Sequence, residues 1–297
     1  MDIVLDLGQS GARVKIGEEV LSYPIAKQTS ESVPSAVERV LQQLPKSEFE
    51  RAYLSLTGLL GNVGDVEPFG ELCYKYFGTR EVFVMDDGLA AYFGALGKSN
   101  GVVLTIGGGV VAVSGNKGKF GHADGKGQIF GDLGGGFWVG QAGMRRALAT
   151  LDGRDSAQDL VELLSTEINA HDALANKTSV DAATLCIKAA ATVAQGAEKG
   201  NKSALEILEE GAAHLSDTVV AAWRKVSDKP EERPEVAFLG GLSQSAVYVN
   251  LIEQGIKKQL DSLFVQPRSN HLDGAPLAAE LLPNGAPPLF KRWSREN

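Results

Sequence analysis

Residues 3–16 read IVLDLGQSGARVKI, and residues 102–114 read VVLTIGGGVVAVS. Each stretch is an apolar run, a turn rich in glycine and a second apolar run, which is the pattern of two strands joined by a tight turn. Because this design occurs once early in the chain and again further along, the sequence predicts a duplicated α/β unit.

The segments around the two hairpins alternate between strand and helix patterns, as α/β folds require. The expected strands beyond the hairpins are 19–25, 52–56, 81–85 and 236–239, and the expected helices are 32–44, 66–77, 89–96, 137–151, several within 156–228, about 245–260, and 274–282. A polar stretch at 97–100 suggests a boundary between domains at 1–97 and 98–297. The last helix is expected to pack back on the N-terminal domain, and the tail to be a surface segment or a brace.

Composition narrows the class of protein. A chain of 297 residues with 43% hydrophobic residues can form two globular domains. Its net charge of −8 argues against nucleic acid or an anionic membrane as a main partner. We find no signal-peptide pattern at the start and no apolar run long enough to cross a bilayer. Two distant cysteines fit a reducing cytoplasm better than a disulfide framework.

The first hairpin offers a candidate phosphate and metal site. Asp6 ends a strand, and the turn Gly8-Gln9-Ser10-Gly11 bares backbone N–H groups that a phosphate could approach closely. Asp6 could hold Mg²⁺ through water, because this ion keeps much of its hydration shell. An ordinary hairpin turn with a capping aspartate explains the same residues.

Asp87 is the candidate general base. It lies between the strand 81–85 and a helix, and carboxylates at the ends of such strands face the ligand crevice in α/β folds. A carboxylate there can accept the proton of an attacking hydroxyl. The alternative is a helix N-cap, a role that Asp86 or Asp87 could equally fill.

Three further glycine-rich segments complete the candidate set. Gly107-Gly108-Gly109 could form a second phosphate turn, although glycines that simply need a positive φ would also explain it. Asp132, flanked by glycines before a helix, could hold sugar hydroxyls or a metal-bound water, or could be a loop cap. Gly240-Gly241 follows a strand and could lie against a flat adenosine. No GxxxxGK[ST] or GxGxxG motif occurs, so neither a Walker ATPase nor a Rossmann dehydrogenase is supported.

In this order, the motifs resemble the sugar kinase branch of the actin/hexokinase/Hsp70 superfamily. They resemble more closely the BadF/BadG/BcrA/BcrD ATPase family, which includes N-acetylglucosamine and glucosamine kinases. The similarity runs from Asp6 to about Ala279. It implies an α/β, two-domain actin-like ATPase (ribonuclease H-like) fold with a cleft between duplicated domains, with ATP and Mg²⁺ as cofactors and a small sugar as the other partner.

The resemblance also implies roles for individual residues. It assigns proton abstraction from the acceptor to Asp87, sugar contacts to Asp132 and Gly108, and metal contacts to Asp6 and Asp132. The nucleotide-binding residues that it implies are Asp6, Gly8, Gln9, Ser10, Gly11, Gly107, Gly108, Gly109, Gly240, Gly241 and Gly274.

The chain departs from the family pattern where hydroxyl and acidic groups are expected. Gly108 and Val110 replace a Thr and a Ser, and Leu133 replaces a Glu. We expect an ATP-dependent amino-sugar kinase that acts on N-acetylglucosamine or glucosamine, as a monomer or a homodimer. Two alternatives stay open: a nucleotide- or sugar-binding sensor, and an ATPase activator of a reductase or dehydratase, whose iron–sulfur cluster needs a cysteine pattern not found here.

Overall fold

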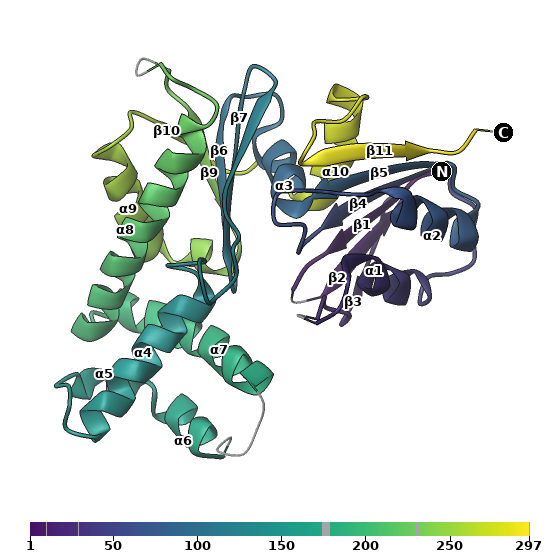
Figure 1. Cartoon of the computed structure of the whole chain (residues 1–297). Helices are drawn as coiled ribbons and strands as arrows, with labels where there is room; N and C mark the ends of the chain where they lie inside the picture. Colours follow the sequence, from purple (N-terminus) through teal and green to yellow (C-terminus); the bar gives the residue numbers. More distant parts are fainter. Residues whose placement is uncertain (10, 29, 174–178, 230–231, 297) are drawn as a thin grey trace. The chain divides into compact units, whose positions relative to one another are not determined.

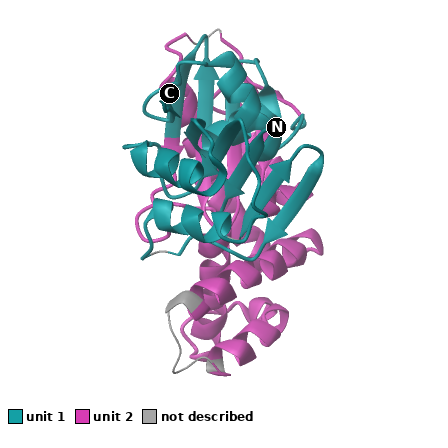
Figure 2. Ribbon diagram, turned by 90° about the vertical axis from the view of Figure 1, so that its right-hand side faces the viewer, with its two compact units in different colours: residues 1–103, 113–122, 266–297 teal, residues 104–112, 123–265 magenta. Residues whose placement is uncertain are grey.

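The computed structural model describes residues 1–9, 11–28, 30–173, 179–229 and 232–296. The chain forms two compact units (Figure 2): unit 1 comprises residues 1–103, 113–122 and 266–297, and unit 2 comprises residues 104–112 and 123–265. The chain passes between the units within strands β6 (Gly101–Ile106), β7 (Val110–Asn116) and β8 (Lys119–Asp124), and a fourth time between Val265 and Gln266. The single boundary expected from sequence lies at 97/98.

Unit 1 contains a six-stranded sheet with the strand order β11-β5-β4-β1-β2-β3. Its strands are β1 (Ile3–Leu7), β2 (Ala12–Ile16), β3 (Glu19–Tyr23), β4 (Arg51–Leu56), β5 (Glu81–Asp86) and β11 (Phe290–Ser294). Strands β1, β4 and β5 are parallel, so their carboxyl ends reach the same edge of the sheet. Strand β2 is antiparallel to both β1 and β3.

The two faces of this sheet pack against different helices. Alternate residues of β1, among them Leu5 and Leu7, belong to a buried apolar core with α1 (Val33–Leu41) and α2 (Glu67–Phe77). Since side chains alternate across a strand, Val4 and Asp6 lie on the opposite face. Helix α10 (His271–Leu281) contacts β1 and β4 and packs along α3 (Asp87–Leu96), as Figure 1 shows.

The end of the chain forms a strand that local sequence did not predict. Strand β11 lies beside β5 and pairs antiparallel with it (Figure 1). The register sets Trp293 opposite Val82. The indole of Trp293 is 6% exposed, donates to Glu67 Oε2 at 2.9 Å, and covers Gly70, where no side chain would fit. The residues expected to form a surface segment or a brace therefore complete the edge of the sheet.

Unit 2 combines a sheet of strand order β10-β9-β6-β7-β8 with a set of helices. Its further elements are α4 (Gly136–Leu151), α5 (Gln158–Leu163), α6 (Ser165–Ala173), α7 (Ser179–Glu198), α8 (Lys202–Arg224), β9 (Glu235–Leu239), the 3₁₀ turn η1 (Gly241–Gln244), α9 (Ala246–Lys257) and β10 (Leu263–Phe264). Helices α4 and α7 meet at Gly140, where a Cβ atom would lie 1.7 Å from the carbonyl oxygen of Cys186. The contact therefore requires glycine. Strands β8 and β10 were not expected from sequence.

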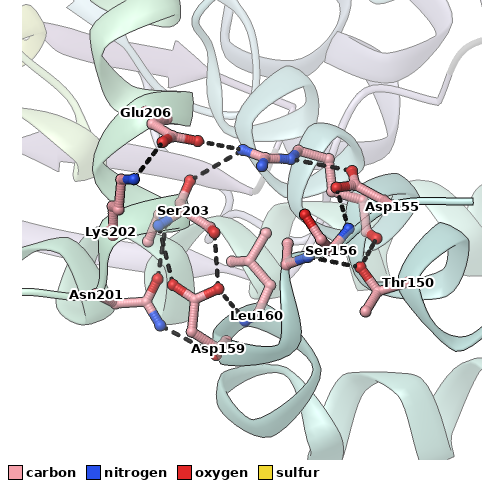
Figure 3. A network of polar contacts seen from close by, with 12 residues as sticks. Thr150, Asp155, Ser156, Asp159, Leu160, Asn201, Lys202, Ser203 and Glu206 are labelled. Carbon is pink, nitrogen blue, oxygen red and sulfur yellow. Dashed lines mark hydrogen bonds and ion pairs between the residues drawn. The ribbon is translucent and has the colours of Figure 1, made fainter. Parts of the chain in front are cut away.

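A polar network joins α5 to the start of α8 (Figure 3). Asp159 accepts hydrogen bonds from the Ser203 amide at 3.0 Å and the Ser203 hydroxyl at 2.7 Å. Asn201 caps α8 by accepting from the Ala204 amide, and its own amide group donates to the carbonyl of Asp159.

In the part of the chain that the structure describes, no helix is both long and apolar enough to cross a membrane.

Candidate functional site

Asp6 lies between two polar side chains of neighbouring strands. The register places Arg13 directly opposite it on β2 and Ser55 directly opposite it on β4. Arg13 Nη2 and Nε lie 2.5 and 3.2 Å from Asp6 Oδ2, and Ser55 Oγ donates to Oδ1 at 2.9 Å. Both carboxylate oxygens are thus already hydrogen-bonded on a residue that is 8% exposed.

Asp86 is the N-cap of α3. Its Oδ1 accepts from the Gly88 amide at 3.1 Å, and its Oδ2 accepts from the Gly61 amide at 3.1 Å. His122 Nε2 lies 3.7 Å from Oδ1. Asp86 is therefore the N-cap, although the Gly88 amide also lies 3.0 Å from Asp87 Oδ1 and is shared by the two aspartates.

Asp87 follows β5 as the first residue of α3 and is half-buried. Burial first, and then the negative charge of Asp86, raise the pKa of Asp87 to about 7, while His271 and the Thr57 hydroxyl favour the charged form. A carboxylic acid with a pKa near 7 exchanges its proton readily at neutral pH, as a general base must. The position and the protonation behaviour of Asp87 both suit the role predicted from sequence.

The first glycine turn is closed by its own backbone. Gly8 donates to the Gly11 carbonyl at 2.9 Å, and the Gly8 carbonyl accepts from the Lys27 amide at 3.2 Å. The turn is therefore tied to the segment that follows β3. Gln9 lies at the exposed tip, and Ser10 lies outside the described residues.

The second glycine turn lies against the start of α4 in unit 2. The amides of Gly136 and Phe137 donate to the carbonyls of Gly107 and Gly108 at 2.8 and 2.9 Å. The Gly108 and Gly109 amides, by contrast, donate no hydrogen bond within the described ranges. Adjacent unpaired amides of this kind suit an anionic ligand.

Asp132 lies against the same turn. It is 6% exposed, adopts a φ of 57°, and places Oδ2 where a Cβ at Gly109 would be 2.5 Å away. Burial and then the charge of Asp124 raise its pKa, against the backbone amides of Val110 and Gly127. Its Oδ1 is buried without a hydrogen-bond partner among the described residues. Such an atom can accept a hydroxyl or a water from a ligand.

The remaining predicted glycines fall into two kinds of place. Gly240, with a φ of 97°, ends β9 where a Cβ would lie 2.4 Å from the Ile106 carbonyl, and Gly241, at the start of η1, borders open space. Gly274 is different, because a Cβ there would lie 1.9 Å from the Ala90 carbonyl of α3. The packing of α10 on α3 already accounts for this glycine.

The described residues hold no cluster of three or more His, Cys, Asp or Glu side chains that could cage a metal ion. Mg²⁺ seldom needs such a cage in phosphotransfer sites, where one or two carboxylates, water and phosphates bind it. Asp6 still has acceptor capacity for a water, since each carboxylate oxygen can accept two hydrogen bonds. Each of Asp6, in unit 1, and Asp132, in unit 2, could contact an Mg²⁺ ion carried by a nucleotide without a protein cage around it.

Sequence reasoning missed Arg13 beside Asp6 and Lys27 beside Gly8. Arg13 could have been found, because the short turn of the hairpin fixes the register that sets Arg13 opposite Asp6. Lys27 had no such signal, because its contact with Gly8 joins segments that are distant in the sequence.

Comparison with known proteins agrees with this fold. The structure is similar to a candidate N-acetylglucosamine kinase from Chromobacterium violaceum, with a TM-score of 0.69 and 22% identity over 93% of this chain and 97% of that chain. A candidate N-acetylglucosamine kinase from Porphyromonas gingivalis has a TM-score of 0.66 and 13% identity over 93% and 97%. A ROK family glucokinase from Streptomyces griseus, in complex with glucose and AMPPNP, has a TM-score of 0.58 and 17% identity over 96% and 99%.

The fold is therefore the two-domain, actin-like ATPase fold that sugar kinases share, as the resemblance implied. The BadF/BadG/BcrA/BcrD ATPase family matches residues 3–279, and the chain belongs to it. No curated protein sequence matches the chain.

Proposed function

We propose that this protein is a sugar kinase that transfers the γ-phosphoryl group of ATP to a hydroxyl of an amino sugar such as N-acetylglucosamine or glucosamine. Membership of an ATPase family and a fold like that of sugar kinases support the proposal. The observation that carries it is the half-buried Asp87 at the end of β5, with its pKa raised to about 7 beside a second aspartate that caps the helix.

Asp87 is proposed to take the proton of the attacking hydroxyl as the bond to phosphorus forms. A sugar hydroxyl is a weak nucleophile, and a nearby carboxylate helps by accepting its proton in the transition state. Asp86 is less suited to this role, because each of its two oxygens accepts a backbone amide, whereas Asp87 accepts one, from Gly88 at Oδ1.

The phosphates are proposed to bind at the glycine turns. Gly108 and Gly109 supply unpaired amides in unit 2, and Gly8, Gln9 and Gly11 form the turn after β1 in unit 1. Mg²⁺ on the nucleotide would neutralise part of the phosphate charge, with Asp6 contacting it through water. Gly240 and Gly241 are proposed to lie beside the adenosine.

Asp132 is proposed to bind the acceptor or a metal-bound water through its unpartnered Oδ1. Asp132→Asn keeps the shape and tolerates the positive φ, because asparagine adopts this conformation comparatively often. If Asp132 binds the sugar, the variant should raise the KM for the sugar and leave the KM for ATP almost unchanged.

Two other functions remain as alternatives. A sensor of the same fold would explain the hydroxyl groups lost at Gly108 and Val110, but it would have no use for a base at Asp87. An activator with a shared iron–sulfur cluster would need a close set of cysteines, whereas Cys73 is completely buried in α2, with its pKa raised by burial to about 12, and the half-buried Cys186 lies on α7.

The test is a panel of sugars with Mg·ATP, scored by ADP release. The panel contains N-acetylglucosamine, glucosamine, N-acetylmannosamine, glucose and a sample without sugar, and Asp87→Asn is the matched inactive control. We expect sugar-dependent ADP release from the wild-type protein with an amino sugar, and a large loss in the variant. ATP binding without turnover on any sugar would favour the sensor instead.

A further inference from the structure

Lys27 lies over a glycine turn next to the candidate base. Its Cε and Cδ atoms are 2.5 and 2.8 Å from the position that a Cβ at Gly58 would occupy, and its Nζ is 3.4 Å from that position. Gly58 has a φ of 80°, which suits glycine. The residue before it, Thr57, is the one whose hydroxyl favours the charged form of Asp87. Lys27 is thus placed close to the residues around Asp87.

The backbone of Lys27 is tied to the other predicted motif of unit 1. Its amide donates to the Gly8 carbonyl at 3.2 Å, so the turn after β1 and the turn after β4 both contact this one residue. The side chain is half-buried. A lysine in this place brings one positive charge to the end of the sheet where Asp6 and Asp87 lie.

No carboxylate in the described part of the chain forms an ion pair with Lys27. Nζ donates only to the Gln28 carbonyl, at 3.0 Å, and an ammonium group has three donors. The acid nearest in sequence is Glu31, which Arg39 holds at 2.7 and 2.8 Å. Of the groups that shift the pKa of Glu31, Lys27 has the smallest effect.

The acidic residues of this region require a nearby cation if a phosphate is to bind there. Asp6, Asp86 and Asp87 repel a phosphate, and the guanidinium of Arg13 is already paired with Asp6. Cations that face the transferring group are a general requirement of phosphoryl transfer, because negative charge gathers on its oxygens. His122 and His271 already face Asp86 and Asp87, whereas Lys27 has no carboxylate partner among the described residues, so it is the cation that we consider here.

We propose that Lys27 Nζ binds an anionic oxygen of the reacting pair, either on the terminal phosphate of ATP or on a carboxylate or phosphate group of the acceptor sugar. The proposal rests on the proposed function. The first source makes Lys27 a catalytic residue for every acceptor. The second source makes it a specificity residue that favours acidic sugars.

The test compares Lys27→Met, which keeps the aliphatic stem, with Lys27→Arg, which keeps the charge. The exposed Lys98→Met is the matched control. Calorimetry measures binding of a non-hydrolysable ATP analogue, of ADP and of inorganic phosphate to the full chain. Steady-state kinetics compares N-acetylglucosamine with its 6-phosphate and with N-acetylmuramic acid, which carries a carboxylate.

If the anion is the terminal phosphate, Lys27→Met should weaken the ATP analogue about 10-fold to 100-fold while ADP changes little, which is the worth of a charge-assisted hydrogen bond. If the anion is on the acceptor, only kcat/KM for the acidic sugars should fall by this factor. Lys27→Arg should restore much of either loss.

The proposal is overturned if Lys27→Met behaves like Lys98→Met with every ligand. Its failure can be told apart from that of the proposed function, because the binding measurements need no turnover. Sugar phosphorylation that is insensitive to Lys27→Met rejects the role of Lys27 alone. If Lys27→Met weakens binding of the ATP analogue but the wild-type protein phosphorylates no sugar, the role of Lys27 is supported and the kinase function is rejected. If the wild-type protein binds none of the ligands, both proposals are rejected.

Discussion

The guanidinium of Arg13 lies against the carboxylate of Asp6, with Nη2 2.5 Å and Nε 3.2 Å from the same oxygen, Oδ2. The two residues are direct cross-strand neighbours in the β1–β2 hairpin, so the register of the hairpin alone brings them together. Asp6 is 8% exposed, whereas the Arg13 side chain is 41% exposed. A nearly buried carboxylate thus depends on a cation at the surface for its charge compensation.

Arg13→Met should therefore destabilise unit 1, because it leaves the Asp6 charge with Ser55 as its remaining side-chain donor among the described residues. We expect a loss of about 1–3 kcal/mol in the free energy of unfolding, the worth of hydrogen bonds to a charged group. Urea denaturation of Arg13→Met, Asp6→Asn and the double variant measures the coupling. If the two single effects simply add, the pair contributes nothing by itself.

Substitution of the two adjacent aspartates at the β5–α3 junction should have different effects, on turnover for Asp87 and on stability for Asp86. Asp87→Asn should lower turnover about 10²-fold to 10⁴-fold with ATP binding intact, because it removes the proposed base but keeps the shape. Asp86→Asn should cost about 1 kcal/mol of stability, because Asp86 caps α3. Kinetics and thermal melts on both variants check this. Near-normal turnover in Asp87→Asn would show that another carboxylate is the base.

The raised pKa of Asp87 predicts two pH dependences. First, kcat/KM should rise as the pH increases through about 7, because the base must be deprotonated. Second, the folded protein binds the proton of the Asp87 carboxyl group more tightly than the unfolded chain does, because aspartates in unfolded chains have pKa values of about 3.9. Wild-type stability should therefore fall relative to Asp87→Asn as the pH rises from about 4 to about 7.

Melting temperatures of both proteins across this pH range give the measurement. The gap between them should stop growing above about pH 7, where Asp87 is charged in both the folded and unfolded states. A gap that stays constant with pH would mean that the carboxyl titrates normally in the folded protein.

Local patterns were enough to predict the elements that carry the candidate site. The expected strand 12–16 coincides with β2. The expected strand-to-helix junction at Asp86 and Asp87 is present, although α3 begins at Asp87 and not at Leu89. These features follow from apolar alternation and turn residues, which act within a few positions of the chain. The helix expected at 274–282 begins earlier, at His271, because Asn270 caps it.

The features that were missed depend on long-range contacts. Strand β11 lies in a tail of mixed charge and proline, and its conformation comes from the free edge of β5. Lys27 reaches its place through contacts with Gly8 and Gly58, which lie on other segments. Neither the pairing of β11 with β5 nor the contacts of Lys27 with Gly8 and Gly58 can be identified from the neighbouring residues in the sequence. The site roles predicted from the motifs, including that of Asp87, stay predictions.

Trp293 should be the residue through which β11 stabilises unit 1. It is 6% exposed, covers Gly70 of α2 and donates to Glu67. Trp293→Ala should cost about 3–5 kcal/mol, as other buried aromatic deletions do. Arg292→Ala, at an exposed position of the same strand, is the control and should cost less than ~1 kcal/mol. Equal effects in denaturant melts would mean that strand pairing, and not the indole, provides the stability.

Asp159 should stabilise the junction of α5 and α8 in a pH-dependent way (Figure 3). Burial raises its pKa, but hydrogen bonds from the Ser203 hydroxyl, the Ser203 amide and the Leu160 amide outweigh it and hold the pKa below its usual value. The folded protein therefore binds this proton less tightly than the unfolded chain. The stability that Asp159 supplies is complete above the unfolded pKa of about 4 and is lost as the pH falls through the lower folded value.

Asp159→Asn should accordingly reduce the free energy of unfolding by about 1–2 kcal/mol at pH 7, because the charged acceptor of three hydrogen bonds becomes a neutral one. The difference from the wild type should shrink as the pH falls below about 4, where the wild-type carboxylate is itself protonated. Urea denaturation at several pH values measures both quantities. Asp152→Asn is the control, since Asp152 is 60% exposed and pairs with an exposed Arg154, so little change is expected. A difference at pH 7 that persists unchanged in acid would mean that the shape of the side chain, and not its charge, holds the junction.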